Sequence, residues 1–217
     1  MVRRTKEEAL ETRNRILDTA EKVFHSKGVS RTSLADIAIA AGVTRGAIYW
    51  HFKNKADLFE AMMKRMKLPM EEMVERAGSE ALADPLDYVR QCSLAVLERL
   101  TTDPQCRCVT EISRYKVEYA DDMESLRERH IECRTEALTL IERGLRNAAK
   151  KGMLAPNVDP HLAAIGLHAL VDGLIHNWIL DPSYIKLAKA AAPLIDGYLR
   201  GLRAVTVART ATTKKRA

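Results

Sequence analysis

The chain has few of the residues that interrupt helices, with ten glycines and seven prolines among its 217 residues. Ala, Leu, Glu, Lys and Arg favour helices and are abundant, so the composition predicts an all-helical protein. No uninterrupted apolar run reaches the about 18 residues of a membrane span, and we therefore expect no membrane segment. The N-terminal residues lack the apolar core of a secretory signal, which predicts a cytoplasmic protein.

Motifs of the common enzyme classes are missing as well. The sequence contains no GxSxG nucleophile turn, no HExxH zinc motif and no glycine-rich phosphate loop, so we predict no enzyme activity and no cofactor. The four cysteines lack zinc-site spacing and are expected to be reduced thiols. His168, Asp172 and His176 are spaced by four residues on one helix face and could hold a metal. Because core histidines are commoner than ligands, we predict no metal site there and leave the decision to metal analysis.

The chain does contain a helix-turn-helix pattern, in residues 32–55. Ala38, Gly42 and Ile48 are spaced four and six residues apart. This spacing places a small residue at a helix contact, glycine at a sharp turn and a β-branched residue on the inner face of the second helix. Such a unit holds its second helix ready for the major groove, which predicts duplex DNA as a partner.

The outer face of that second helix carries the expected base contacts. Arg45 can donate to guanine O6 and N7, and the methyl groups of Thr44 and Ala47 can contact a thymine methyl. Thr44 is also the expected N-cap. His51 is better placed for phosphates, whereas Tyr49 is equally consistent with phosphate contact and with packing. The predicted DNA-contacting set is Arg3, Arg4, Thr32, Ser33, Thr44, Arg45, Gly46, Ala47, Tyr49, Trp50, His51 and Lys55.

The charge distribution supports binding to DNA. Residues 1–55 carry eleven basic and six acidic side chains, residues 56–208 carry 20 and 23, and the last nine residues carry four and none. The excess of basic side chains in residues 1–55 suits binding to DNA phosphates. Arg3 and Arg4 begin a basic arm that could contact phosphates or the minor groove. We expect residues 206–217 to be a disordered basic tail.

Apolar periodicity and helix start and stop signals predict about nine helices. The first spans 6–27, and the helix-turn-helix pair follows it. A fourth helix is expected from Asn54 to Arg76, with a kink or interruption at Pro69. Asp-Pro pairs, which place proline in a first helical turn, open three of the later helices. The remaining predicted ranges are 84–100, 103–115, 121–151, 159–180 and 183–203.

Residues 12–58 resemble the DNA-binding domain of the TetR family of bacterial transcription regulators. The matching residues are Ile16-Leu17, Phe24, Gly28, Thr32, Asp36-Ile37-Ala38, Ala41-Gly42-Val43, Tyr49, Phe52 and Lys55. The runs GVTRGAIYWHFKNKADLF and RRTKEEALETR further resemble the branch that represses resistance-nodulation-division multidrug efflux pumps, the acriflavine-resistance type. The likeness continues at Asp84–Leu86, Glu111-Ile112, Lys116, Glu118, Asp172-Gly173-Leu174-Ile175 and Trp178.

The resemblance implies a homodimer whose C-terminal domain binds an inducer. It predicts a helix-turn-helix DNA-binding domain at 1–53 and a ligand-binding and dimerisation domain at 54–205. The segment 159–180 is apolar nearly all round, more than one core face requires. Together with 183–203 it is expected to pair across a two-fold axis as a four-helix bundle. A two-fold dimer suits a palindromic operator with two half-sites.

The expected inducer is a small hydrophobic or aromatic compound. Asp172 is the one carboxylate within 160–180, so it must either pair with a protein cation or await a ligand, and the resemblance places a pocket residue there. Glu111 is a second candidate, which Arg114 could neutralise from one turn away. Lys67 stands where the acriflavine-type repressor has an acid, which leaves the inducer's charge open. The predicted ligand set is Met66, Lys67, Val96, Glu111, Arg114, Cys133, Ala137, Ile141, His168, Asp172, Ile175 and Trp178.

The predicted function is therefore a repressor of a multidrug efflux operon, released from DNA when an inducer favours a splayed dimer. Two alternatives remain at this stage. One is a regulator of the same family acting on a metabolic or stress operon. The other is an architectural DNA-binding protein that has no inducer and no sequence preference.

Overall fold

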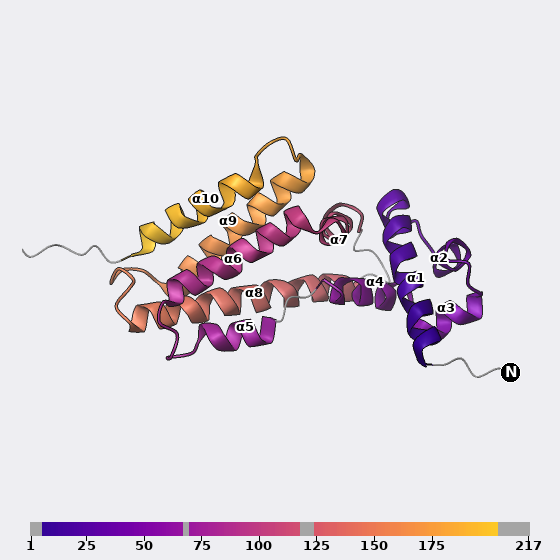
Figure 1. Cartoon of the computed structure of the whole chain (residues 1–217), viewed down its shortest axis with the longest axis horizontal. Coiled ribbons are helices and arrows are strands. Elements are labelled where there is room, and N and C mark those ends of the chain that lie inside the picture. The colour runs from indigo at the N-terminus through magenta and orange to yellow at the C-terminus, as the bar shows by residue number, and fades with distance from the viewer. Residues whose placement is uncertain (1–5, 67–69, 118–123, 204–217) are drawn as a thin grey trace, which may run out of the picture.

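The computed structural model describes residues 6–66, 70–117 and 124–203, and these form ten helices and no strands (Figure 1). The helices are α1 (Lys6–Lys27), α2 (Leu34–Ala40), α3 (Arg45–His51), α4 (Lys55–Lys64), α5 (Met70–Ala77), α6 (Pro85–Thr102), α7 (Pro104–Tyr115), α8 (Glu124–Lys150), α9 (Pro160–Leu180) and α10 (Leu187–Leu202). The expected all-helical fold is confirmed. Arg3, Arg4, Lys67 and the expected tail at 206–217 lie outside the described residues.

The described residues form ten helices, where about nine were expected. The helix predicted from Asn54 to Arg76 is two helices, because α4 ends at Lys64 and α5 begins at Met70. Pro69 lies between them, and proline has no N–H for a continuing helix ladder. The last helix also begins later than predicted, at Leu187, because Asp181 accepts from the Ser183 amide and hydroxyl in a turn before it.

Three Asp-Pro pairs set helix starts as predicted. The carboxylates of Asp84, Asp103 and Asp159 each accept a hydrogen bond from a backbone amide in the first turn of the helix that follows. Proline at the first helical position removes an N–H that would have had no partner. These local signals fix where α6, α7 and α9 begin without help from the rest of the fold.

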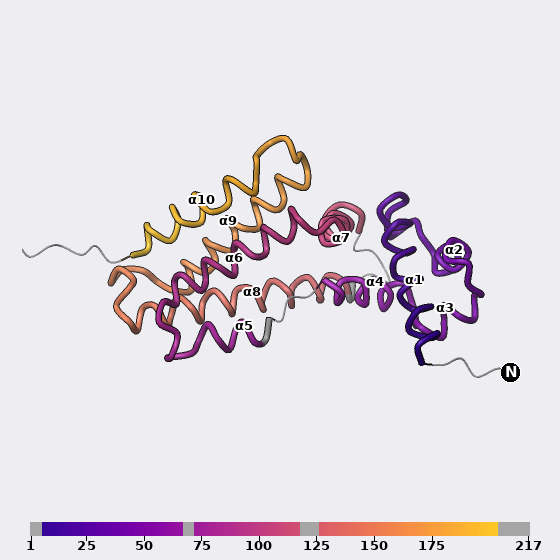
Figure 2. The backbone as a smooth tube through the Cα atoms, in the orientation of Figure 1, coloured from indigo at the N-terminus to yellow at the C-terminus, as the bar shows by residue number. Residues whose placement is uncertain are grey.

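Two apolar cores organise the chain. In the first, α1, α2, α3 and α4 bury side chains such as Phe24, Ile37, Ile48 and Leu58. Val109 and Ile112 of α7 and Leu126 of α8 join this same core. Figure 2 shows α4 running from the N-terminal helices toward α8, with α7 beside α1. The N-terminal unit is therefore closed by α4 and by two helices of the second half.

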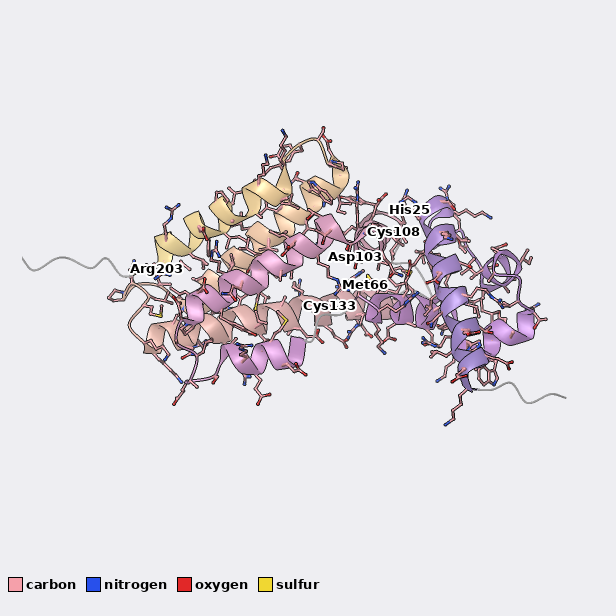
Figure 3. All side chains as sticks on the ribbon, in the orientation of Figure 1. His25, Met66, Asp103, Cys108, Cys133 and Arg203 are labelled. Atoms are coloured by element: carbon pink, nitrogen blue, oxygen red, sulfur yellow. The ribbon has the colours of Figure 1, made fainter. Side chains whose placement is uncertain are left out.

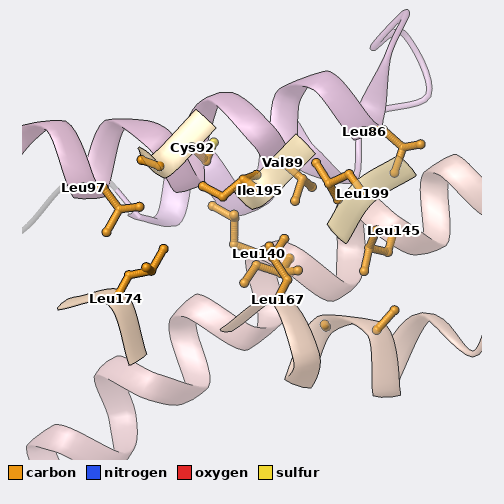
Figure 4. Close-up of a cluster of buried hydrophobic side chains, with 14 of the residues drawn as sticks. Leu86, Val89, Cys92, Leu97, Leu140, Leu145, Leu167, Leu174, Ile195 and Leu199 are labelled. Carbon is orange, nitrogen blue, oxygen red and sulfur yellow. The ribbon is translucent and has the colours of Figure 1, made fainter. Parts of the chain in front are cut away.

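The second core lies among α6, α8, α9 and α10. Figure 4 shows Val89 of α6, Leu140 of α8, Leu167 of α9 and Ile195 of α10 pointing toward one another, and all four are buried. This four-helix packing forms the larger part of the molecule (Figure 1).

Helix α9 is the one described helix that is long and apolar enough to cross a membrane by length and composition, with 21 residues and a mean hydropathy of 1.3. A search for uninterrupted apolar runs does not detect this helix, because His168, Asp172 and His176 interrupt the run. The mean hydropathy of an 18-residue window within the helix stays high despite these three residues. In the structure α9 packs against α6, α7, α8 and α10 and buries Leu167 and Trp178 in the second core. It is a core helix with one uncovered side.

The contact between α6 and α8 leaves no room for a side chain at Gly144. A Cβ built there would overlap Cγ2 of Val89, which is β-branched, buried and unable to move aside cheaply. We predict that Gly144→Ala lowers the free energy of unfolding by about 1–3 kcal/mol in urea denaturation followed by circular dichroism. Gly78→Ala, where the neighbours lie at ordinary contact distance, should change it by less than about 0.5 kcal/mol. Equal stability of the two variants would contradict this packing.

Candidate nucleic-acid interface and effector site

The helix-turn-helix is built by local hydrogen bonds. At the start of α2, Ser33 Oγ accepts from the Asp36 amide at 3.1 Å, and Asp36 Oδ2 accepts from the Ser33 amide at 2.9 Å. This reciprocal capping box fixes the first turn. Gly42 has φ +64°, where L side chains are strained, and the next amide, of Val43, donates to the carbonyl of Ala38 at 3.0 Å. The predicted turn between the two helices is thus present.

Helix α3 carries most of the residues that the sequence predicts to contact DNA. Thr44 Oγ1 accepts from the Ala47 amide at 3.1 Å, which makes Thr44 the N-cap as expected. Ile48 is fully buried and anchors the helix. Trp50 is 73% exposed. The Arg45 guanidinium lies 5.7 Å from the centre of the Tyr49 ring, so the ring holds the guanidinium by a cation–π contact. Large aromatic side chains this exposed leave surface for a partner to cover.

The predicted DNA-contacting residues do not all reach the surface. Ser33, Thr44, Arg45, Gly46, Tyr49 and Trp50 are exposed, and Ala47, His51 and Lys55 are partly buried. Thr32 is only 2% exposed, and its hydroxyl donates to the Gly28 carbonyl at 2.7 Å. The structure therefore corrects its expected role, because the hydroxyl completes the turn before α2 instead of facing DNA. Lys55 Nζ donates to the Ser30 carbonyl at 3.3 Å and so holds the same turn.

Asp172 has a protein partner. Arg114 on α7 forms a hydrogen-bonded ion pair with the Asp172 carboxylate on α9. Partial burial raises the pKa of Asp172, but the hydrogen bond and charge of Arg114, aided by His168 and His176, outweigh it and leave the pKa below its usual value. Of the two alternatives that the sequence left open for Asp172, the structure has the pairing with a protein cation.

Glu111 lies elsewhere than predicted. Its carboxylate is 3.2 Å from Nε2 of His25 on α1, while Arg114 turns to α9. Positions 111 and 114 of α7 therefore face different neighbours, although they are one turn apart. The expectation that Arg114 neutralises Glu111 was wrong, because the packing of α7 between α1 and α9 offers each charge a partner from a distant segment.

The described members of the predicted ligand set come from α6, α7, α8 and α9, with Met66 just after the end of α4. Ile141 and Trp178 are buried, and the rest of the described set is half-buried: Met66, Val96, Glu111, Arg114, Cys133, Ala137, His168, Asp172 and Ile175. Figure 3 shows Met66 and Cys133 at the junction of α4 with α8. Burial lowers the pKa of His168, with the nearby Asp172 carboxylate acting in the opposite sense.

Two further side chains belong to this region but were missed. The guanidinium of Arg107 lies 4.8 Å from the centre of the Trp178 ring. Arg129 precedes Cys133 by one turn of α8, and its Nε is buried with no hydrogen-bond acceptor among the residues that the structure describes. The four-residue spacing of positions 129, 133 and 137 could have indicated Arg129, but a charged residue was not sought on a stripe that was chosen for apolar walls.

Two surface cavities lie away from these residues. One of about 650 Å³ lies between α5 and α8 and is lined by Arg76, Arg143 and Asn147 among others. The second, of about 420 Å³, lies between α6 and α10. The predicted ligand residues line neither of them. Within the described ranges, no group of three His, Cys, Asp or Glu side chains is arranged to hold a metal, and His176 Nδ1 instead lies 3.0 Å from the Tyr115 hydroxyl.

An exposed helix held out by a helix-turn-helix, with a larger helical domain behind it, defines a DNA-binding regulator. Residues 16–62 match the family described as bacterial regulatory proteins, tetR family, and residues 84–204 match the C-terminal region of the MAATS-type transcriptional repressors. The chain belongs to the TetR family of transcription regulators. Regulators of this family bind operator DNA and small molecules and act as dimers, and they are not enzymes, as predicted.

Individual relatives match over nearly the whole length. TtgR, a transcriptional regulator of Pseudomonas putida, is 41% identical over 94% of this chain and 97% of its own. NalD, the secondary repressor of the MexAB-OprM multidrug efflux pump in Pseudomonas aeruginosa, has a crystal structure that superposes with a TM-score of 0.84 at 36% identity, covering 91% of this chain and 98% of its own.

A complex of SmeT with triclosan gives a TM-score of 0.81 at 33% identity, covering 95% of this chain and 99% of that one. SmeT is the repressor of the Stenotrophomonas maltophilia multidrug efflux pump SmeDEF. The similarity to these proteins therefore covers both the N-terminal helix-turn-helix and the C-terminal helices of the chain.

The ion pair between Arg114 and Asp172 predicts a pH-dependent stability. Since the folded pKa of Asp172 is lowered, its contribution is complete above the unfolded value of about 3.9 and is lost as the pH falls through the folded pKa. Arg114→Met should lower the free energy of unfolding at pH 7 by about 1 kcal/mol, less than for a fully buried pair because the Asp172 side chain is 46% exposed.

Urea denaturation at several pH values measures this effect. The difference between wild type and Arg114→Met should shrink as the pH falls below about 3.9, where the contribution of the ion pair is lost. Arg127→Met, which changes an exposed arginine on α8, serves as the control. A loss that is the same at every pH would show that the arginine acts by packing and not by its charge.

Proposed function

We propose that this chain represses a multidrug efflux operon and leaves its operator when a hydrophobic or aromatic compound binds the effector domain. The observation that carries this proposal is the similarity along nearly the entire chain to NalD and SmeT, each described as a repressor of a multidrug efflux pump. The triclosan bound to SmeT supports an aromatic ligand for a fold of this kind.

The proposed DNA-binding unit consists of residues 1–53, with α3 in the major groove. Arg45 stands at the first helical position of α3, where a side chain reaches base edges, and its guanidinium is exposed. Tyr49, Trp50 and His51 follow toward the end of the helix that faces the phosphates. Lys55, Ser33 and the basic arm of Arg3 and Arg4 complete the proposed backbone contacts.

Substitutions at the two ends of this surface should behave differently. Arg45→Ala should lower the preference for operator over random duplex by about 1–3 kcal/mol for each half-site, because a bidentate contact to guanine contributes about that much discrimination. Lys55→Ala should weaken binding to both duplexes alike, because a phosphate contact carries no sequence information. Fluorescence anisotropy with both duplexes at one salt concentration measures the two effects. An equal loss on both duplexes for Arg45→Ala would refute its assignment.

The proposed inducer site lies where α7, α8 and α9 meet, within the domain from residue 54 to 205. The pair of Arg114 and Asp172 supplies polar groups of both signs in a half-buried place. Trp178, with Arg107 over its ring, supplies an aromatic wall. The Nε–H of Arg129 is a buried donor that a ligand oxygen could satisfy. These features support an aromatic compound that carries a hydrogen-bonding group.

The proposed dimer interface is the uncovered face of α9 and α10. On α9 the exposed residues follow a spacing of three and four, so they share one face: Leu162, Ile165, Ala169, His176 and Leu180. Leu194 of α10 is 40% exposed beside Pro193 and Gly197, which leave room for close approach. Apolar faces of two adjacent helices are covered efficiently when a second copy forms a four-helix bundle about a two-fold axis.

Inducer release is tested by a mobility-shift titration. DNA upstream of the chain's own coding sequence is footprinted first, and the protected duplex is then used as the operator. Triclosan, the compound bound by SmeT, should weaken operator binding at least about fivefold, because a coupling of about 1–3 kcal/mol changes affinity by about 5–150-fold. If triclosan, a panel of hydrophobic antibiotics and plant phenols all leave the shift unchanged, the inducer is of another class and the efflux proposal fails.

A further inference from the structure

Helix α7 is joined to α1 by polar contacts at three levels. Near its start, Gln105 Nε2 donates to both carboxylate oxygens of Glu21, at 2.8 and 3.1 Å. Near its middle, Glu111 lies 3.2 Å from His25. At its end, the Lys116 carbonyl accepts from the Val29 amide at 2.8 Å. Figure 3 shows Asp103 and Cys108 along α7 on the side toward His25 of α1.

Glu21 differs from the other junction residues because three helices share its carboxylate. It belongs to α1, it accepts from Gln105 of α7, and it lies 3.5 Å from Nη1 of Arg65, the C-cap of α4. It is also 8% exposed, so the charge is nearly buried at the point where the DNA-binding unit meets the rest of the chain. A buried and shared carboxylate fixes angles between helices that apolar packing alone leaves adjustable.

The segment just after α4 is also held by α6. Nη1 of Arg99, on α6, donates to the Met66 carbonyl at 3.0 Å, and Nε of Arg99 lies 3.5 Å from Asp103. Asp103 also caps α7 by accepting from the amides of Gln105 and Cys106. The end of α4 and the start of α7 are thus two ends of one hydrogen-bonded network.

Stability does not account for the charge on Glu21. Burial raises the pKa of this carboxyl, and the opposing hydrogen bond from Gln105 and the charge of Arg65 do not fully cancel that rise. A raised carboxyl pKa means that the ionised group is less favourable in the folded chain than in the unfolded one at neutral pH, a loss that is relieved as pH falls through the folded pKa. A buried ionic group that does not add stability is better explained by the specific arrangement that it imposes.

We propose that Glu21 is a positioning residue for operator binding: by pairing with Gln105 and Arg65 it sets the orientation of the helix-turn-helix unit relative to α7. The inference rests on operator binding by α3, which is proposed above. It adds that Glu21 sets the orientation in which α3 meets the operator. Two recognition helices of a dimer must match the spacing of two half-sites, so a small change in this orientation in each copy lowers specific affinity. Non-specific affinity, which depends on charge, is unaffected.

The test exchanges the two partners. Gln105→Glu places a second carboxylate against Glu21 and should weaken binding to the footprinted operator about five- to tenfold, within the range of ordinary coupling between sites. The double variant Glu21→Gln with Gln105→Glu restores one carboxylate and one amide and should bind within about twofold of wild type. Fluorescence anisotropy measures binding to the operator and to a scrambled duplex of equal length.

Controls separate positioning from folding and from charge. Asp18→Asn removes another Arg65 partner on α1, 2.7 Å from Nη1, that does not touch α7, and it should leave operator affinity within about twofold. Affinity for the scrambled duplex and the circular dichroism spectrum should be unchanged in all variants. If Gln105→Glu does not fold, Gln105→Met removes the donor without adding charge and should give the same loss in specific affinity.

Two results overturn the inference. One is unchanged operator affinity in both Gln105 variants, and the other is a loss that the double variant does not restore. A wild type that binds operator and scrambled duplex equally would instead overturn the proposed function, and the inference with it, so the two failures are distinguishable.

Discussion

A unit of one 22-residue helix and two seven-residue helices buries little apolar surface, and the arrangement of the whole chain depends on how that deficit is met. Here α4 adds Leu58 and Met62 to the core, and α7 adds Val109 and Ile112 from the second half of the sequence. Because these side chains are almost completely buried, the helix-turn-helix unit shares the first of the two cores with α7 of the second half. Helices α7 and α1 are therefore joined by direct packing in a close-packed interior.

Polar pairs then select one arrangement among those that apolar packing allows. Arg114 and Asp172 are 58 residues apart, Gln105 and Glu21 are 84 apart, and Arg90 pairs with Asp196 across 106 residues. Each pair joins a different couple of helices: α7 with α9, α7 with α1, and α6 with α10. Such pairs contribute modestly to stability when they are partly exposed, but a mismatched partner would leave a desolvated charge. They therefore act on the relative positions of the helices.

Helix α9 combines both requirements. One side carries Leu167 and Trp178 into the second core, and another carries Asp172 to Arg114. The remaining side exposes Leu162 and Leu180, each more than 60% accessible in the single chain. A helix of this apolarity is stable in water only when other helices cover it, which connects the effector region to the surface that we propose for dimerisation.

Local chemistry determined much of the fold from the sequence alone. The bounds of α1, the capping residue Thr44, the turn at Gly42 and the Asp-Pro helix starts depend on neighbours within four residues, and the structure has each of them. The exposed face of α3 follows in the same way, because helical periodicity assigns Ile48 to the interior. An interruption near Pro69 was also predicted. The sequence did not predict that α4 and α5 are two separate helices.

Only the tertiary structure decided which distant groups meet. From the sequence, a buried carboxylate at Asp172 requires a cation or a ligand, and several arginines could have paired with it. The packing of α7 against α9 decided that the partner is Arg114. The same packing turned Glu111 toward His25, and the fold of the turn before α2 placed Thr32 inside. Coulombic and hydrogen-bonded partners depend on distances between helices that are far apart in the chain, and helical periodicity carries no information on those distances.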